Sequence, residues 1–200
     1  GREGPLRVTD PAPSEPLYRA LIAAAEEVGI RHNPDYNGAS QDGIAMSQAS
    51  ISGGRRMSTA HCYLDPIRHR SNLHIVTDAL TEKLEIAGRQ CTGVRYSVDG
   101  KVHVAQATRD TIVCAGTINS PQLLELSGIG QPERLRALGI EVLQELVGVG
   151  ENLRDHYAPR TRWAIDAEGY TFNDRGRGLG LVNQALRYFI SREGMLGMVA

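Results

Sequence analysis

The sequence predicts an α/β fold, in which short strands and helices alternate along the chain. A continuous apolar run of strand length, residues 110–115, is followed at once by a glycine and a helix-start signal. Extended runs flank the turn dipeptide Asp99-Gly100, which is typical of a β-hairpin. Apolar residues also recur at helical spacing near both ends of the chain, in residues 16–28 and 181–192.

The first predicted helix follows an extended lead-in rich in proline and glycine. Ser14 can cap this helix, Pro16 lies in its first turn, where a missing N–H costs nothing, and Gly29 ends it. Its apolar face is predicted to consist of Leu17, Leu21, Ala24 and Val28. Residues 33–56 are dense in Gly, Asn, Ser and Asp, and therefore predict turns and short strands.

The middle of the chain predicts mostly extended structure. A short helix after Arg56 is expected to end before Pro66, and a buried strand is expected at residues 72–77. Three further extended runs follow, at residues 81–86, 92–98 and 102–107. The turn signals between these runs favour a small antiparallel meander.

The apolar run at residues 110–115 is expected to lead into a helix through a tight junction. Ser120 is a suitable N-cap, Pro121 suits the first helical position, and Gly128 can end the helix. Gly116 would let a ligand approach the main chain, and the helix N-terminus adds a partial positive charge, so this place suits a phosphate-bearing cofactor. The simpler interpretation is that any tight strand–helix junction requires a glycine.

The remaining predicted elements are a helix from Pro132 to Leu138, a strand within residues 140–146, a turn at 148–156, an extended run at 161–165 and a helix at 181–192. The residues of the last helix expected to face a core are Ala185, Leu186, Phe189 and Ile190.

The amino-acid composition limits the classes of molecule that this protein is expected to bind. The chain has 200 residues, of which 41% are hydrophobic and 22% charged, as in an ordinary globular domain. Its 22 basic and 23 acidic residues give a net charge of −1, which offers no field to attract nucleic acid. No run reaches the roughly 18 apolar residues of a transmembrane segment, and the start lacks the apolar run of a signal peptide. We expect both ends to be cuts within a longer chain, because Gly1 is not an initiating Met and Ala200 follows no polar tail.

The three cysteines are widely spaced and show no metal-ligand pattern, which predicts neither disulfides nor a zinc site. A reducing, cytoplasmic compartment fits them best, and peripheral association with a membrane is left open. Cys62 and Cys114 lie in apolar contexts and are expected to be small core residues.

Two linked motifs resemble the glucose–methanol–choline (GMC) family of FAD-dependent oxidoreductases. The run GTINSPQLLELSGIG (116–130) looks like the second signature of that family, and GVGENLRDH (148–156) resembles the segment that follows it at the same distance. Other stretches keep the order and spacing of the family: DYNGASQDG (35–43), GGRRMSTAHCYL (53–64), RSNLHIVTDALTEKL (70–84) and TGVRY (92–96). The likeness is nearest to choline-dehydrogenase-like and bacterial alcohol-dehydrogenase-like members.

The resemblance implies a partial Rossmann-like FAD-binding domain with a β-meander at residues 57–155. Segments of an α+β substrate domain are implied at residues 1–56 and 156–200. Because the first βαβ unit of such a domain is not among the matched segments, we expect the isolated chain to expose a sheet edge and to be poorly soluble.

FAD is the implied cofactor, and three residues are implied to lie beside it. Thr81 stands where the family has a Val whose main chain contacts the adenine side of FAD, and a main-chain contact tolerates the change. Ala115 and Gly116 match the Ala-Gly pair close to the ribose and pyrophosphate. The GxGxxG motif and the catalytic histidine of the family are not found in this chain, so no catalytic residue and no metal ligand is assigned.

Other polar residues are better explained as structural. Arg55 and Arg56 could pair with a phosphate, but we expect them at a loop-to-helix junction. His156 suggests acid–base chemistry, yet its place in a domain-crossing turn favours a hydrogen-bonded structural residue. Asn152 and Asp155 are expected to be turn and cap groups for the same reason.

For the intact protein, the resemblance implies oxidation of a primary alcohol, either choline-like or aliphatic or aromatic, to an aldehyde; this chain alone is expected to be inactive. A histidine base would take the hydroxyl proton while hydride passes to the flavin. The implied partners are a small-molecule alcohol and an electron acceptor, either oxygen or a quinone. Two alternatives remain open: a non-catalytic scaffold or binding module, and a nicotinamide-dependent dehydrogenase, against which the missing fingerprint argues.

Overall fold

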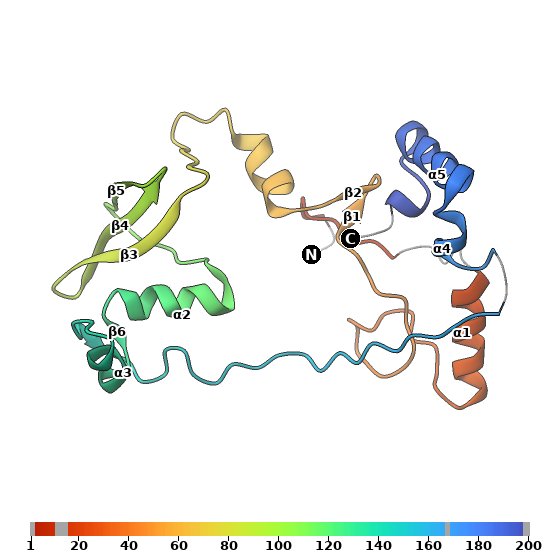
Figure 1. Ribbon diagram of the computed structural model, residues 1–200, viewed down its shortest axis with the longest axis horizontal. Coiled ribbons are helices and arrows are strands. Elements are labelled where there is room, and N and C mark those ends of the chain that lie inside the picture. Colours follow the sequence, from red (N-terminus) through yellow and green to blue (C-terminus); the bar gives the residue numbers. More distant parts are fainter. Residues whose placement is uncertain (1–2, 11–15, 167–168, 198–200) are drawn as a thin grey trace. The chain divides into compact units, whose positions relative to one another are not determined.

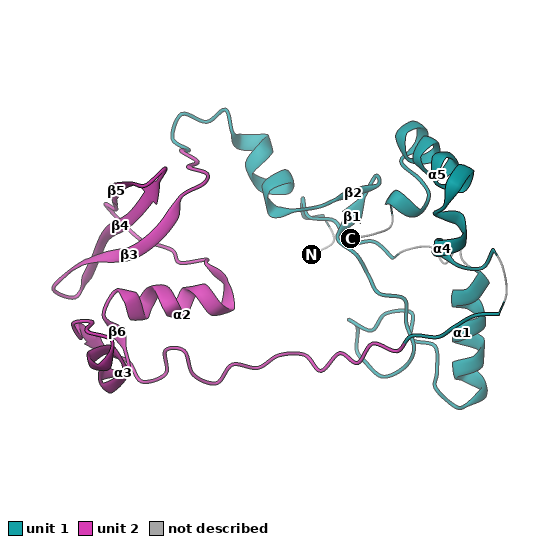
Figure 2. Cartoon of the chain, viewed as in Figure 1, with its two compact units in different colours: residues 1–73, 162–200 teal, residues 74–161 magenta. Residues whose placement is uncertain are grey.

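The computed structural model describes residues 3–10, 16–166 and 169–197 (Figure 1). The chain forms two compact units (Figure 2): unit 1 comprises residues 1–73 and 162–200, and unit 2 comprises residues 74–161. The predicted domain boundaries near residues 56 and 155 remain a prediction.

Unit 2 begins with a three-stranded antiparallel meander. Its strands are β3 (Leu80–Ala87), β4 (Gln90–Val98) and β5 (Lys101–Gln106), in the order β3-β4-β5. Asp99 (φ 49°) and Gly100 (φ 74°) both adopt the left-handed conformation that a two-residue hairpin turn of type I′ requires. The predicted meander and its turn are therefore confirmed.

The rest of unit 2 packs two helices around a small core. Helix α2 (Gly116–Leu126) is followed by strand β6 (Ile129–Gly130), helix α3 (Pro132–Ala137) and strand β7 (Gln144–Glu145), which pairs in parallel with β6. The buried apolar residues of this unit are Leu84, Leu123, Leu135 and Val149. The helix predicted from Pro132 is confirmed, whereas the strand predicted within residues 140–146 is reduced to two residues.

Three predicted extended segments are not strands. Residues 72–77, 110–115 and 161–165 form no β ladder with any part of the chain that the structure describes. Each of them exposes a large apolar side chain to solvent: Val76 is 56% exposed, Ile112 82% and Trp163 83%. The prediction of a buried strand was wrong at the first two because a strand forms only beside a pairing neighbour, which local apolar character does not supply.

Helix α2 begins earlier than its sequence predicts. The helix starts at Gly116 and its N-cap is Ala115, so Ser120 is not the cap and Pro121 lies inside the helix. Pro121 has no N–H to donate to the carbonyl one turn earlier, and the helix nevertheless passes through it. The positive φ of Gly116 (88°) turns the chain into the helix before the capping signal is reached.

In the part of the chain that the structure describes, all the remaining helices belong to unit 1. These are α1 (Pro16–Glu27), α4 (Phe172–Arg175), α5 (Gly178–Ser191), a π-helix (Ala60–Leu64) and two 3₁₀ helices (Asp65–Ile67 and Met195–Gly197). Strands β1 (Ile51–Ser52) and β2 (Arg55–Arg56) pair antiparallel. The predicted helix before Pro66 therefore exists, but it continues through Pro66 as a 3₁₀ turn. Ser14, the predicted cap of α1, lies outside the described residues.

The helices at both ends of the chain are confirmed, but their predicted inner faces are wrong. In α1 the buried residue is Ala25, whereas Leu21 is 57% exposed and Val28, just after the helix, is 75% exposed. In α5 the buried residue is Gln184, whose Oε1 accepts a hydrogen bond from the main-chain N–H of Met195 (3.1 Å). The predicted core residues Leu186, Phe189 and Ile190 are exposed, and Ala185 is half-buried. This polar contact lies on the side of α5 that the unit covers.

Candidate functional site

The N-terminus of α2 presents an open stretch of main chain. Ala115, Gly116 and Thr117 are all exposed. A Cβ atom built on Gly116 would meet no other atom within 4 Å, and the first turn of the helix carries no acidic side chain. A helix start with free N–H groups, no bulky side chain and no competing carboxylate fits a phosphate or ribose hydroxyl. The residues present thus fit the pyrophosphate side of FAD, which the resemblance assigns to Ala115 and Gly116.

Thr81 lies on strand β3, at the outer edge of the meander. It is exposed and pairs with Tyr96 of β4, just before a register shift between Thr81 and Lys83. In the described part of the chain β3 has a pairing strand on one side only, so some of its main-chain groups face away from the sheet. Such an edge is compatible with the main-chain contact that the resemblance assigns to Thr81.

A buried hydroxyl joins the meander to α2. The Oγ of Ser127 accepts a hydrogen bond from the main-chain N–H of Leu84 (2.8 Å) and donates one to the carbonyl of Leu123 (2.6 Å). Ser127 is 3% exposed, so these bonds form away from water. Because Leu84 is in β3 and Leu123 is in α2, this contact holds the two elements that carry Thr81 and Gly116 in one packed unit. Sequence reasoning missed Ser127, although it lies within the motif 116–130.

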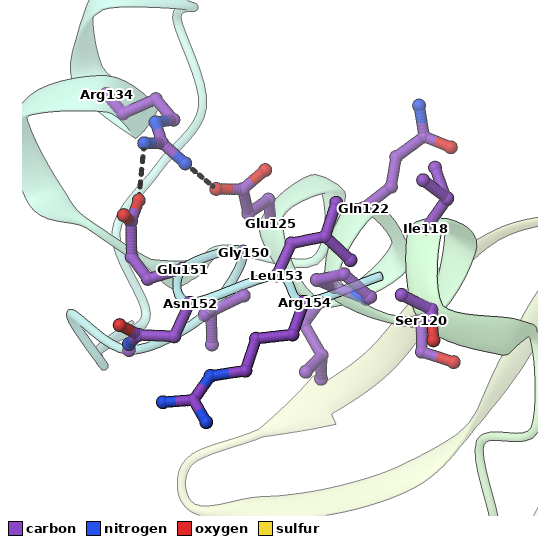
Figure 3. Close-up of a pocket in the computed structure, with 15 residues that line it drawn as sticks. Ile118, Ser120, Gln122, Glu125, Arg134, Gly150, Glu151, Asn152, Leu153 and Arg154 are labelled. Carbon is purple, nitrogen blue, oxygen red and sulfur yellow. Dashed lines mark hydrogen bonds and ion pairs between the residues drawn. The ribbon is translucent and has the colours of Figure 1, made fainter. Parts of the chain in front are cut away.

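An open cleft of about 710 Å³ runs along α2 (Figure 3). One wall is α2 itself, from Thr117 to Glu125, and the other is the segment from Gly148 to Arg154. Both motifs on which the resemblance depends therefore contribute to one concave surface. Sequence reasoning linked these motifs by family likeness, and the structure brings them together.

Arg134 of α3 lies at one end of this cleft and pairs with two carboxylates. Its Nη1 is 2.9 Å from Oε1 of Glu125, and its Nη2 is 2.8 Å from Oε1 of Glu151 (Figure 3). The hydrogen bonds that the Arg134 guanidinium donates to Glu151 and Glu125 raise its pKa above the ordinary value. The side chain of Arg154 extends away from this pairing. No pattern in the sequence identified Arg134.

Of the other polar residues considered from the sequence, Asn152 lines the cleft, and Arg55, Arg56, Asp155 and His156 are exposed and do not line it. Arg55 and Arg56 form the exposed strand β2. His156 is exposed, and its main-chain N–H bonds to Oδ1 of Asp155 (2.7 Å). Asn152 has a positive φ of 59°, as expected of a turn residue.

The cysteine prediction is confirmed for one residue and wrong for another. Cys62 is buried, but Cys114 is exposed, because the run that was expected to be a buried strand has no covering layer in the described residues. Among the residues that the structure describes, no cluster of His, Cys, Asp and Glu could hold a metal ion. None of the helices in that part of the chain combines the length and apolar character needed for a membrane crossing.

Comparison with known proteins gives a consistent picture. Residues 2–158 match the family described as GMC oxidoreductase. An oxygen-dependent choline dehydrogenase of Chromohalobacter salexigens is 47% identical over an alignment 201 positions long, which covers 92% of this chain and 36% of the relative. This chain therefore spans little more than a third of the length of that relative.

Solved structures agree with the sequence comparison. An FAD-dependent oxidoreductase from Chaetomium thermophilum superimposes with a TM-score of 0.86 at 26% identity, covering 100% of this chain and 35% of that one. Pyridoxine 4-oxidase from Mesorbium loti superimposes with a TM-score of 0.67 at 31% identity, covering 72% of this chain and 29% of that one. The predicted fold class, a partial flavoprotein α/β fold with a β-meander, is confirmed.

Proposed function

Because this chain belongs to the GMC oxidoreductase family, we propose that it is part of an FAD-dependent enzyme that oxidises the CH–OH group of a primary alcohol to an aldehyde. The family assignment and the FAD cofactor predicted from the sequence are confirmed at the level of the family. The observation that supports an alcohol substrate is the 47% identity to an oxygen-dependent choline dehydrogenase over 92% of the chain. We propose choline or a related primary alcohol as the substrate.

We assign to this chain a share of cofactor binding and no catalytic residue. The main chain at Ala115 and Gly116 would face the ribose and pyrophosphate, and the main chain of Thr81 would contact the adenine side. The bound flavin would supply the oxidising chemistry. The proton acceptor would be a histidine elsewhere in the intact protein, so the present chain alone would be inactive. The free cysteines support the proposal of a cytoplasmic location.

The test uses the intact protein that contains this chain. We expect the purified protein to absorb near ~450 nm, as bound flavin does, and we expect choline to bleach this band under anaerobic conditions. Aliphatic and aromatic primary alcohols serve as comparison substrates. Recovery of the band in air assigns oxygen as the electron acceptor, and recovery only with a quinone analogue assigns a quinone. A flavin band that no primary alcohol bleaches would contradict the proposed substrate class, and NAD-dependent turnover without flavin would contradict the cofactor.

The placement of FAD beside Gly116 can be tested with a matched pair of glycine variants. Gly116 (φ 88°) and Gly139 (φ 70°) both have a positive φ, and a Cβ at either position meets nothing within 4 Å. Alanine therefore introduces similar backbone strain at both positions. We expect Gly116→Ala to weaken FAD binding in the intact protein about tenfold, or roughly 1.4 kcal/mol, because its new methyl group would contact the cofactor. Gly139→Ala should leave FAD affinity unchanged. Equal FAD affinities for the two variants, measured by titrating the apoprotein, would remove Gly116 from the site.

A further inference from the structure

Four side chains join α2, α3 and the turn that follows β7 into one polar cluster, which we call the Arg134 cluster; Figure 3 labels Glu125, Arg134 and Glu151 of this cluster. Its members are Glu125 from α2, Gln131 and Arg134 from the start of α3, and Glu151 from the turn. Arg134 pairs with both carboxylates, and Nε2 of Gln131 donates a hydrogen bond to the same Oε1 of Glu151 (2.9 Å). Oε1 of Glu151 therefore accepts hydrogen bonds from two donor groups, one on Gln131 and one on Arg134.

The backbone around Glu151 is shaped to present its carboxylate to Arg134. Gly150 (φ 77°) and Asn152 (φ 59°) both adopt left-handed conformations, so Glu151 stands between two reversals of the chain. The main chain at Gly150 passes close to the ion pairs: a Cβ there would lie 3.4 Å from Nη1 of Arg134 and 3.5 Å from Oε1 of Glu125. The close approach of this turn to Arg134 thus depends on the backbone as well as on the charges.

Glu151 is also the last anchored residue of unit 2. From Asn152 to residue 161, where unit 2 ends, the chain has no helix or strand and every residue is exposed. Within the described residues, the only hydrogen bond of this stretch is local, from His156 to Asp155. We call residues 152–161 the exit segment. Its first three residues line the cleft beside α2.

We propose that Arg134 is a positioning residue, which through Glu151 fixes the start of the exit segment against α2 and thereby sets the position of one wall of the cleft. An arginine suits this role because its planar guanidinium offers separate nitrogen atoms to two carboxylates at once. A lysine at the same position would keep the positive charge, but its single ammonium group would not offer two nitrogen atoms in a fixed plane. The proposal concerns how the chain is held, so it stands independently of the alcohol substrate proposed above.

The experiment compares hydrogen exchange of main-chain amides in the intact protein and in three variants. For Arg134→Met we expect the amides of Val149 and Glu151, which donate main-chain hydrogen bonds to Leu146 and Gly148, to exchange about three- to tenfold faster, as the loss of two partly exposed ion pairs allows. Arg134→Lys should give an intermediate rate. Arg136→Met is the matched control, since Arg136 lies on the same helix and makes no ion pair in the described part of the chain. In Arg136→Met, the amides of residues 148–156 should exchange at the same rate as in the unaltered protein.

Two results would overturn the proposal. One is an unchanged exchange rate at residues 148–156 in Arg134→Met. The other is an equal acceleration in peptides from the meander, residues 80–106, which would show that Arg134 only contributes to overall stability. A rescue by Arg134→Lys confined to residues 148–156 supports positioning, because a general loss of stability would not be restored at one segment alone. None of these readouts requires bound flavin, so they are separate from the test of the proposed function.

Discussion

Replacing Gly128 by alanine should lower the free energy of unfolding of the intact protein by about 3 kcal/mol. Gly128 follows α2 with a φ of 81°, and a Cβ there would lie 2.5 Å from the carbonyl oxygen of Glu141 and 2.9 Å from Cγ of Leu143. The same residue accepts main-chain hydrogen bonds from Leu143 (2.9 Å) and Gln144 (3.1 Å). The new methyl group would therefore push apart the two chain segments that these hydrogen bonds join.

The control for this prediction is Gly139→Ala, which introduces a positive-φ alanine into open space. Backbone strain alone should lower the free energy of unfolding by about 1 to 2 kcal/mol. Denaturant unfolding followed by circular dichroism measures both variants. If Gly128→Ala were no more destabilising than Gly139→Ala, the close approach of the two segments would not be a significant source of stability.

Replacing Leu135 by alanine should lower the free energy of unfolding by a similar amount, about 3 kcal/mol. Leu135 of α3 is 0% exposed, so its truncation leaves a cavity that the surrounding residues fill only in part. Leu138 follows the same helix and is 67% exposed, and Leu138→Ala should change stability by only about 0.5 kcal/mol. The difference between these two leucine variants, measured by the same denaturant titration, isolates the contribution of burial. Similar values for the two would contradict the position of Leu135 in the core of unit 2.

The parts of the fold that were predicted correctly are those governed by local chemistry. Asp99-Gly100 adopts the turn that its residue types require, and Pro132 begins a helix as expected. Residues 110–115 have the composition of a buried strand, but strand formation depends on a neighbour, and none pairs with them in the described residues. The predicted start of α2 was wrong for a related reason. Ser120 has the residue type of a cap, but the turn at Gly116, four residues earlier, starts the helix.

The residues of the candidate site also differ in whether the sequence alone could identify them. Thr81, Ala115 and Gly116 were assigned through family likeness, and their role in binding FAD remains a prediction. Ser127 and Arg134 could not have been found from spacing, since their partners are distant in sequence: Leu84 and Ser127 are 43 residues apart, and Arg134 and Glu151 are 17 apart. A hydroxyl or a guanidinium becomes informative only when the fold shows which groups it meets.

The division of the chain into two units also determines which unit is synthesised completely first. Unit 2 is one continuous stretch, residues 74–161, whereas unit 1 is assembled from residues 1–73 and 162–200. The ribosome therefore synthesises all of unit 2 before it synthesises residues 162–200, the second part of unit 1. Contacts between the two parts of unit 1 can form only after the 88 residues of unit 2 have been synthesised. Closing such a long loop makes the contacts of unit 1 non-local, and non-local contacts form slowly. During translation, residues 1–73 thus emerge well before α5, which belongs to the same unit.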